Sequence, residues 1–183
     1  MSHFVVTAVG ADRPGIVAAV SKVFVEQGCN IEDSAMTILR AQFAMMLVIA
    51  APDHVDGAAL QSALARPASE LDLVVTVQAV AADAETVHEQ IDPAAQRWTV
   101  SVHGADHPGI VHGVADVLAR ADVNIIDLTT RVVGGEERPA YVMILEVSLP
   151  TDLAPDDLRA RLDDVAKSLG VSANLHPSEA DIL

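Results

Sequence analysis

The chain of 183 residues contains the same short motif twice, and this internal repeat constrains its fold more than any other feature. Residues Gly10–Val17 read GADRPGIV, and residues Gly104–Val111 read GADHPGIV. The alignment that joins the two motifs continues without a gap to Asp33 and Asp127. Because a long internal repeat indicates repeated structural units, the sequence predicts two modules rather than one domain.

Hydrophobic periodicity gives each copy the order strand, helix, strand, strand, helix, strand. In the first copy we expect strands at His3–Val9, Ile31–Leu39, Phe43–Ala50 and Leu73–Val80, and helices from Ile16 and over Val55–Leu71. In the second copy we expect strands at Trp98–His103, Ile125–Val133, Ala140–Leu149 and Val171–Leu175, and helices from Ile110 and over Asp156–Leu169. This order predicts an α+β fold of two ferredoxin-like βαββαβ modules. Each would be a four-stranded antiparallel sheet with two helices on one face.

The predicted boundaries are 1–81 for the first domain, 82–96 for a linker, 97–176 for the second domain and 177–183 for a tail. In both copies an Asp near the N-cap and a Pro in the first turn are expected to begin the first helix. Pro67 is expected to kink the second helix of the first copy or to end it early.

The charge balance excludes one class of partner. The chain has 11 basic and 26 acidic residues, a formal net charge of -15, and neither half is basic. Direct binding to a nucleic acid is therefore not expected, because that affinity comes largely from Lys and Arg. The acidic residues are interpreted as a solvated surface first and as a face for a basic protein partner second.

Cysteine content and hydropathy indicate the cellular compartment expected for the chain. Cys29 is the only cysteine, so an intramolecular disulfide cannot form. No secretion signal and no membrane-spanning run are recognised, and a cytoplasmic protein is therefore expected.

Three features of the repeated turn suggest a ligand site. A helix N-terminus offers backbone N–H groups, and Gly15 and Gly109 allow close approach. Asn30 and Asn124 precede the second strands, and we expect them at the same end of the sheet as the turn. Together these groups would suit the carboxylate and ammonium of an amino acid. A purely structural role stays open, since Asp often caps helices and Asn often bonds to its own turn.

The two motifs resemble the signature of ACT domains. Asp12–Val17 with Gly28–Asp33 carries the first resemblance, and His107–Val111 with Val123–Asp127 carries the second. Two such domains with no enzyme attached are similar to the glycine cleavage repressor family. The resemblance implies a non-enzymatic regulator that binds a small amino acid at domain interfaces, with glycine or serine favoured. It also implies action through a protein partner, and a homodimer is expected because exposed sheet edges need cover.

The resemblance assigns the ligand site to equivalent residues of both copies. They are Asp12, Arg13, Pro14, Gly15, Ile16, Asn30, Ile31, Asp33, Asp106, His107, Pro108, Gly109, Ile110, Asn124, Ile125 and Asp127. Arg13 corresponds to His107, and Glu32 corresponds to Ile126, so the two sites are expected to differ in ligand or one to be silent.

Three other hypotheses compete with a regulator that binds an amino acid. His103, His107 and His112 lie close in sequence but on different elements, so no metal site and no cofactor are expected. A second interpretation takes Arg13 and Asn30 as the phosphate clamp and the water-positioning amide of an acyl-phosphate hydrolase, but the second copy lacks that Arg. A module that binds no ligand and serves only for assembly is the third reading.

Overall fold

The computed structural model describes residues 1–80, 96–134 and 140–178, and the chain divides into two compact units, Met1–Thr86 and Val87–Leu183. The first unit contains β1 (Ser2–Ala11), α1 (Ile16–Glu26), β2 (Asn30–Leu39), β3 (Gln42–Ala51), α2 (Gly57–Leu71) and β4 (Leu73–Ala79). The second contains β5 (Gln96–Ala105), α4 (Ile110–Arg120), β6 (Asn124–Val133), β7 (Ala140–Leu149), α5 (Pro155–Leu169) and β8 (Val171–Pro177). Residues 82–95 of the predicted linker and 179–183 of the predicted tail lie outside the described residues.

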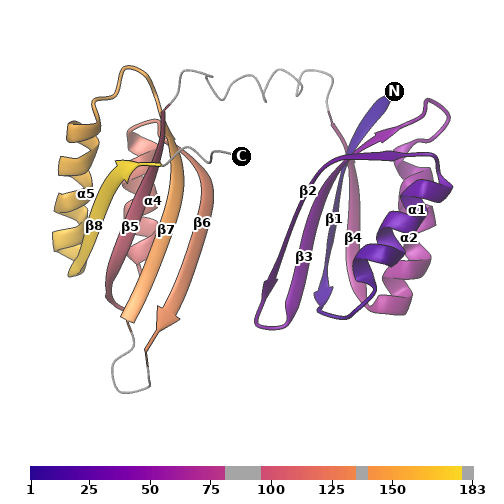
Figure 1. The fold of residues 1–183 in the computed structure, drawn as a ribbon, viewed down its shortest axis with the longest axis horizontal. Helices are drawn as coiled ribbons and strands as arrows, with labels where there is room; N and C mark the ends of the chain where they lie inside the picture. The colour runs from indigo at the N-terminus through magenta and orange to yellow at the C-terminus, as the bar shows by residue number, and fades with distance from the viewer. Residues whose placement is uncertain (81–95, 135–139, 179–183) are drawn as a thin grey trace. The chain divides into compact units, whose positions relative to one another are not determined.

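Each unit is a four-stranded antiparallel sheet with two helices on one face, which confirms the predicted ferredoxin-like modules (Figure 1). The strand order is β2-β3-β1-β4 in the first sheet and β6-β7-β5-β8 in the second. In the described residues, no helix is long and apolar enough to cross a membrane.

Alternation along the central strands builds the core. Phe4, Val6 and Ala8 of β1 are buried beneath the helices, and the residues between them point to the other face of the sheet. Helix α1 buries Ile16 and Val20 at helical spacing. The second unit repeats this core at the equivalent positions, as the two hydrophobic clusters show.

Pro67 does not end α2 early, which was one of the two outcomes predicted for it, the other being a kink. The helix continues through Pro67 to Leu71 and is 15 residues long, the same length as α5. A proline removes one backbone donor, but tertiary packing can hold the remaining turns together. Leu60 and Leu64 are buried in the core, and Leu71 packs against it beyond the proline.

Gly104 marks a close approach between β5 and β8. A Cβ atom at this position would lie 2.7 Å from Val171 Cγ1 and 3.0 Å from Val171 Cβ. The two strands are therefore packed around the missing side chain, and Gly10 plays the same part between β1 and β4.

Gly104→Ala is expected to destabilise the second module by about 1–3 kcal/mol, because the added methyl group overlaps Val171. Urea unfolding followed by the fluorescence of Trp98, the only tryptophan, reports on this module alone. Adding Val171→Ala should recover part of the loss by removing the overlapping atoms. If the two losses were simply additive, the close approach would not be the cause.

Candidate functional site

The turn after β1 places a glycine, not the expected aspartate, at the start of α1. Gly15 is the N-cap residue, with a φ of 95°, and no side chain caps the helix. The prediction that Asp12 lies near the N-cap and Pro14 in the first helical turn is therefore wrong. Two further residues separate Asp12 from the cap, and its backbone N–H instead donates to Ala41 O in the β2–β3 turn, at 2.9 Å.

This turn leaves the start of α1 open. The first N–H groups of a helix have no partner within the helix, and here no side chain accepts from them. A Cβ built at Gly15 would meet no atom within 4 Å, so the approach to the helix is unobstructed. Uncapped donors at the positive end of the helix dipole suit a carboxylate. All four residues from Asp12 to Gly15 are exposed, so one module alone would not enclose a ligand.

The second turn repeats this geometry. Gly109 is the N-cap of α4 with a φ of 102°, again without a side-chain cap and with open space at the Cβ position. The positive φ at both glycines explains why the sequence keeps them, since other residues adopt that conformation at a cost of about 1 kcal/mol.

His107 ties the second turn to the end of α5. Its Nδ1 lies 3.0 Å from Pro108 O and its Nε2 lies 2.6 Å from Leu169 O. Both partners are carbonyl acceptors, and an imidazole donates from both nitrogens only when it is protonated. The bonds to Pro108 and Leu169, helped by the charge of Asp106, therefore raise the pKa of His107 above its ordinary value. Arg13 occupies the equivalent position in the first module.

The asparagines lie at the other end of the sheet from the turns, and the prediction that they share one end is wrong. In the sheet register, His3 and Asn30 both pair with Ala50, whereas Ala11 pairs with Gln42. The physical reason is the helical crossover: α1 returns the chain to the end where β1 began, so β1 and β2 run in the same direction. Eight residues of strand, about 27 Å, separate the two ends.

This separation also bears on the hydrolase reading. Arg13 follows the end of β1, and Asn30 begins β2 at the other end of the same sheet. The two side chains therefore cannot act on one phosphate within one module. In the described residues, no group of three or more His, Cys, Asp or Glu side chains could hold a metal ion.

The other predicted site residues lie in the two cores or beside irregularities in the strands. The side chains of Ile16 and Ile110 are buried in the two cores, so only their backbone N–H groups are available at the helix start. Asp33 lies beside a register shift in β2, and its Oδ1 accepts from Ser34 N at 2.7 Å. Ile125 and Asp127 flank the equivalent shift in β6.

The Tyr141 hydroxyl is a polar group near the second turn that the motif did not identify. Tyr141 pairs with Gly104, and its hydroxyl is buried with no hydrogen-bond partner in the described residues. Burial raises the pKa of Tyr141, and the charge of Asp106 raises it further; Thr130 offsets part of the rise without reaching hydrogen-bond geometry. The sequence repeat could have indicated this hydroxyl, because the position equivalent to Tyr141 in the first copy is Phe43, which has no hydroxyl group.

A hollow of about 350 Å³ lies at the end of the second module where β7 leads into α5. Gln96, Leu149 and Pro155 are among the residues that line it. Leu149 pairs with Gln96 at the beginning of β5, so this hollow lies at the opposite end of the sheet from the His107 turn. It is therefore separate from the predicted site.

Comparisons with known proteins match both halves of the chain. The ACT domain model matches residues 98–161, and a second ACT domain model matches residues 2–78. The chain is 26% identical over 176 residues to the glycine cleavage system transcriptional repressor of Escherichia coli K12, covering 96% of this chain and 88% of that protein. It is 47% identical over 79 residues to a UPF0237 protein of Methanopyrus kandleri, covering 43% of this chain and 88% of that protein.

A solved structure supports the same architecture. The crystal structure of an unknown protein from Galdieria sulphuraria matches with a TM-score of 0.79 and 27% identity, covering 97% of this chain and 99% of that one. The likeness therefore includes both modules.

The contribution of His107 to the stability of the second module is expected to depend on pH. Because its pKa is raised on folding, the stabilisation is fully present below the ordinary value of 6.5 and is lost as the pH rises through the folded-state pKa. Trp98-monitored unfolding of His107→Gln should thus differ from wild type more at about pH 6 than at about pH 9. His112→Gln, an exposed substitution on α4, serves as the control. A difference of constant size across this range would contradict the proposed double donation.

Proposed function

The chain belongs to the ACT domain family, with one ACT domain in each half, and on this premise we propose that it is a non-enzymatic regulatory protein that binds a small amino acid and signals to a protein partner. The observation that carries the proposal is the likeness to a glycine cleavage system transcriptional repressor over 96% of the chain. That likeness extends across both modules, so it concerns the tandem arrangement and not one domain alone. Glycine or serine is the favoured ligand because of this relationship.

The turn supplies groups of the right charge for an amino acid. The uncapped N–H groups at the starts of α1 and α4 would bind the carboxylate. Asp12 and Asp106 are exposed beside these helix starts and would attract the ammonium. A small side chain fits a site whose floor is the backbone of Gly15 or Gly109.

Asn30 and Asn124 would contact such a ligand only from a neighbouring ACT module. Strand β2 is exposed along all ten residues and lies at the edge of its sheet, so its backbone is available to another strand. Antiparallel pairing of two such edges would bring the first residue of one strand beside the last residue of the other. Asn30 of one module would then lie near the turn of another, and the ligand would be enclosed between them.

The signal would pass by stabilising one arrangement of modules over another. A ligand shifts such an equilibrium only by the difference in its affinity for the two states. A ligand shared between modules satisfies this condition, because separated modules bind it with fewer contacts. The partner is proposed to be a protein, since a chain with a net charge of -15 is repelled by the phosphates of nucleic acids.

Calorimetric titration with glycine, L-serine and L-leucine tests the proposal. We expect glycine or serine to bind, and Asp12→Asn or Asp106→Asn to weaken the affinity about tenfold through loss of a charge-assisted contact. Asp163→Asn changes the charge equally at an exposed position of α5 and should leave the affinity unchanged.

The asparagines are tested in the same titrations. Asn30→Ala and Asn124→Ala should each weaken binding if a neighbouring module completes the site. Absence of heat with all three amino acids at millimolar concentrations would contradict the proposed ligand class. If neither the two Asp substitutions nor the two Asn substitutions changed the measured affinity, the site would lie elsewhere.

A further inference from the structure

Among the described residues, the Tyr141 hydroxyl is the one buried side-chain nitrogen or oxygen without a hydrogen-bond partner. The exposed fraction of Tyr141 is 8%, and the residue belongs to the same core cluster as Ile110, which begins α4. A buried hydroxyl without a bond costs free energy, and native structures rarely contain one without a reason. Core packing alone would be served as well by a phenylalanine.

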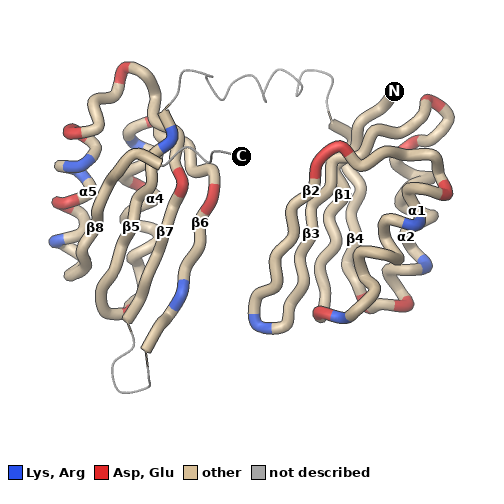
Figure 2. Tube along the Cα trace, viewed as in Figure 1, with Lys and Arg blue, Asp and Glu red and all other residues tan. Residues whose placement is uncertain are grey.

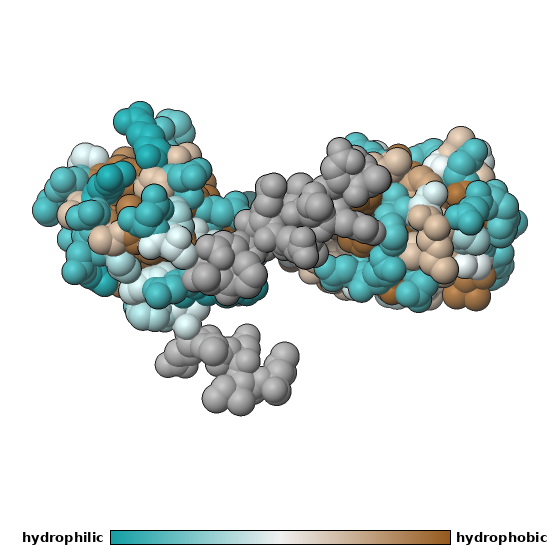
Figure 3. All heavy atoms as spheres, turned by 90° about the horizontal axis from the view of Figure 1, so that it is seen from above, coloured by the Kyte–Doolittle hydropathy of each residue, from teal (hydrophilic) through white to brown (hydrophobic). Residues whose placement is uncertain are grey.

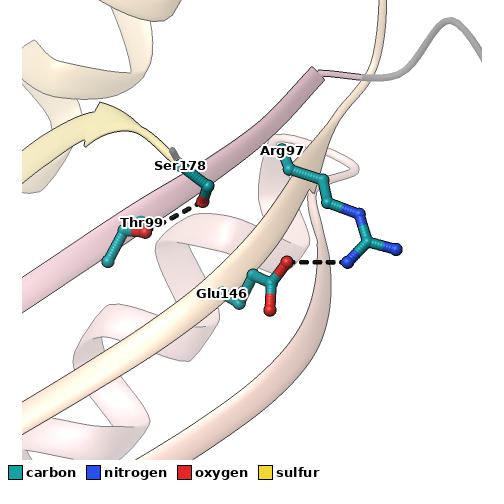
Figure 4. Close-up of polar contacts among 4 residues, drawn as sticks. All are labelled: Arg97, Thr99, Glu146 and Ser178. Atoms are coloured by element: carbon teal, nitrogen blue, oxygen red, sulfur yellow. Dashed lines mark hydrogen bonds and ion pairs between the residues drawn. The ribbon is translucent and has the colours of Figure 1, made fainter. Parts of the chain in front are cut away.

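Polar side chains elsewhere in this module pair with one another. Figure 4 shows two such contacts: Arg97 Nη1 donates to Glu146 Oε1, and the hydroxyls of Thr99 and Ser178 share a hydrogen bond, each at 2.9 Å. The module therefore supplies partners for polar groups of this sheet, and the Tyr141 hydroxyl is left for a group from outside.

The Tyr141 hydroxyl lies between the turn that precedes α4 and the edge strand β6. Tyr141 pairs with Gly104, near the end of β5, and with Val132 of β6. Thr130 lies on the same face as Val132, diagonally across from Tyr141 and within reach of an aromatic side chain. Burial raises the pKa of Tyr141 most, but the charge of Asp106 also raises it and the Thr130 hydroxyl lowers it, so both groups lie close to the hydroxyl.

Both hydroxyls are missing from the first module. Phe43 takes the place of Tyr141, and Met36 takes the place of Thr130. Met36 is 53% exposed, but hydrophobic residues reach the surface among polar ones on both units (Figure 3), so its exposure alone indicates no ligand. The first module builds the same fold without either hydroxyl, so the pair is not needed for folding.

The surroundings of this pair favour a neutral polar group. The charged residues of β6 and β7 are Asp127, Arg131 and Glu146 (Figure 2). Their positions alternate with those of Tyr141 and Thr130, so their side chains point to the opposite face of the sheet. A charged ligand side chain would find no opposite charge on this face of the two strands, whereas a hydroxyl matches the two hydroxyls present.

We propose that the Tyr141 and Thr130 hydroxyls bind the side-chain hydroxyl of an amino acid held at the start of α4, so that the second module selects L-serine over L-alanine. This inference rests on the proposed function, in which the N–H groups of the helix bind the carboxylate and Asp106 attracts the ammonium. A hydroxyl both donates and accepts, so that of the ligand can accept from one of these two groups and donate to the other. Thr130 is exposed on an edge strand, and a change of its rotamer opens the Tyr141 hydroxyl to the ligand.

The selectivity follows from the cost of an unpaired buried group. A site built to bond a hydroxyl rejects an analogue that lacks it, because the polar group of the protein then stays without a partner. L-Serine and L-alanine differ by this one hydroxyl. The first module, with Phe43 and Met36 at these positions, is not expected to distinguish them, which gives a physical basis for two sites of different specificity.

Urea unfolding of the full chain, followed by the fluorescence of Trp98, tests this assignment in the second module alone. A ligand that binds only the folded state raises the unfolding midpoint by mass action. At equal millimolar concentrations, L-serine should raise the midpoint more than L-alanine, as expected for an affinity about tenfold higher.

Tyr141→Phe should reduce the effect of L-serine to that of L-alanine. Without ligand, its midpoint should be unchanged or higher, because the substitution removes a buried hydroxyl that has no bond to lose. Thr130→Val should also reduce the preference for L-serine. Thr129→Val is the matched control: Thr129 pairs with Ile144 on the opposite face, and its loss should leave the preference unchanged.

Equal effects of L-serine and L-alanine on the wild type would overturn the inference, as would a preference that survives Tyr141→Phe. A lower ligand-free midpoint of Tyr141→Phe would also overturn it, since the hydroxyl would then have a structural role. In each case, calorimetric binding of glycine or L-serine to the wild-type chain would leave the proposed function standing. Absence of binding in both experiments would contradict the proposed function and this inference together.

Discussion

Burial of one face of each sheet under two helices is the interaction on which the rest of this structure depends. Alternate residues such as Phe4 and Val6 of β1 fill the core, and Trp98 and Val100 of β5 do so in the second module. Because a strand directs successive side chains to opposite faces, this burial fixes the outward residues as well. The cores are alike in the two modules, whereas outward residues differ: Val5 and Val48 of the first sheet correspond to Thr99 and Glu146 of the second. A shared fold therefore leaves room for different surfaces.

The same architecture decides where ligand-binding groups can lie. Helices α1 and α4 each begin at an uncapped glycine at one end of the sheet and return the chain to the other end, where Asn30 and Asn124 begin their strands. One module thus presents two separate sets of groups, and a ligand that uses both requires two modules. In the proposed function, this geometry would let a shared ligand favour the assembly of two modules.

Most of the fold could be predicted because the repeat and the hydrophobic periodicity agree with each other. The β2–β3 hairpin around Arg40 and Ala41 and the C-terminal limit of α5 followed from local pattern. The helix start was predicted wrongly because an Asp before Pro-Gly resembles a cap, whereas Gly15 adopts a left-handed conformation that sequence does not display. The expectation that Pro67 could end α2 early was wrong because packing of the helix outweighs the local effect of the proline. Placing Asn30 at the correct end of the sheet required the relative direction of β1 and β2, which a sequence motif does not supply.

The central claim is that an amino acid binds at the start of the first helix of a module, and amide NMR spectra of the isotope-labelled chain test it most directly. On addition of glycine or serine, the account predicts that the largest shifts fall on the N–H groups of Gly15, Ile16 and Val17, or of Gly109, Ile110 and Val111. Smaller shifts should appear at Asn30 or Asn124, at the far end of the sheet. Unchanged spectra at millimolar amino acid, or shifts confined to other parts of the chain, would contradict it.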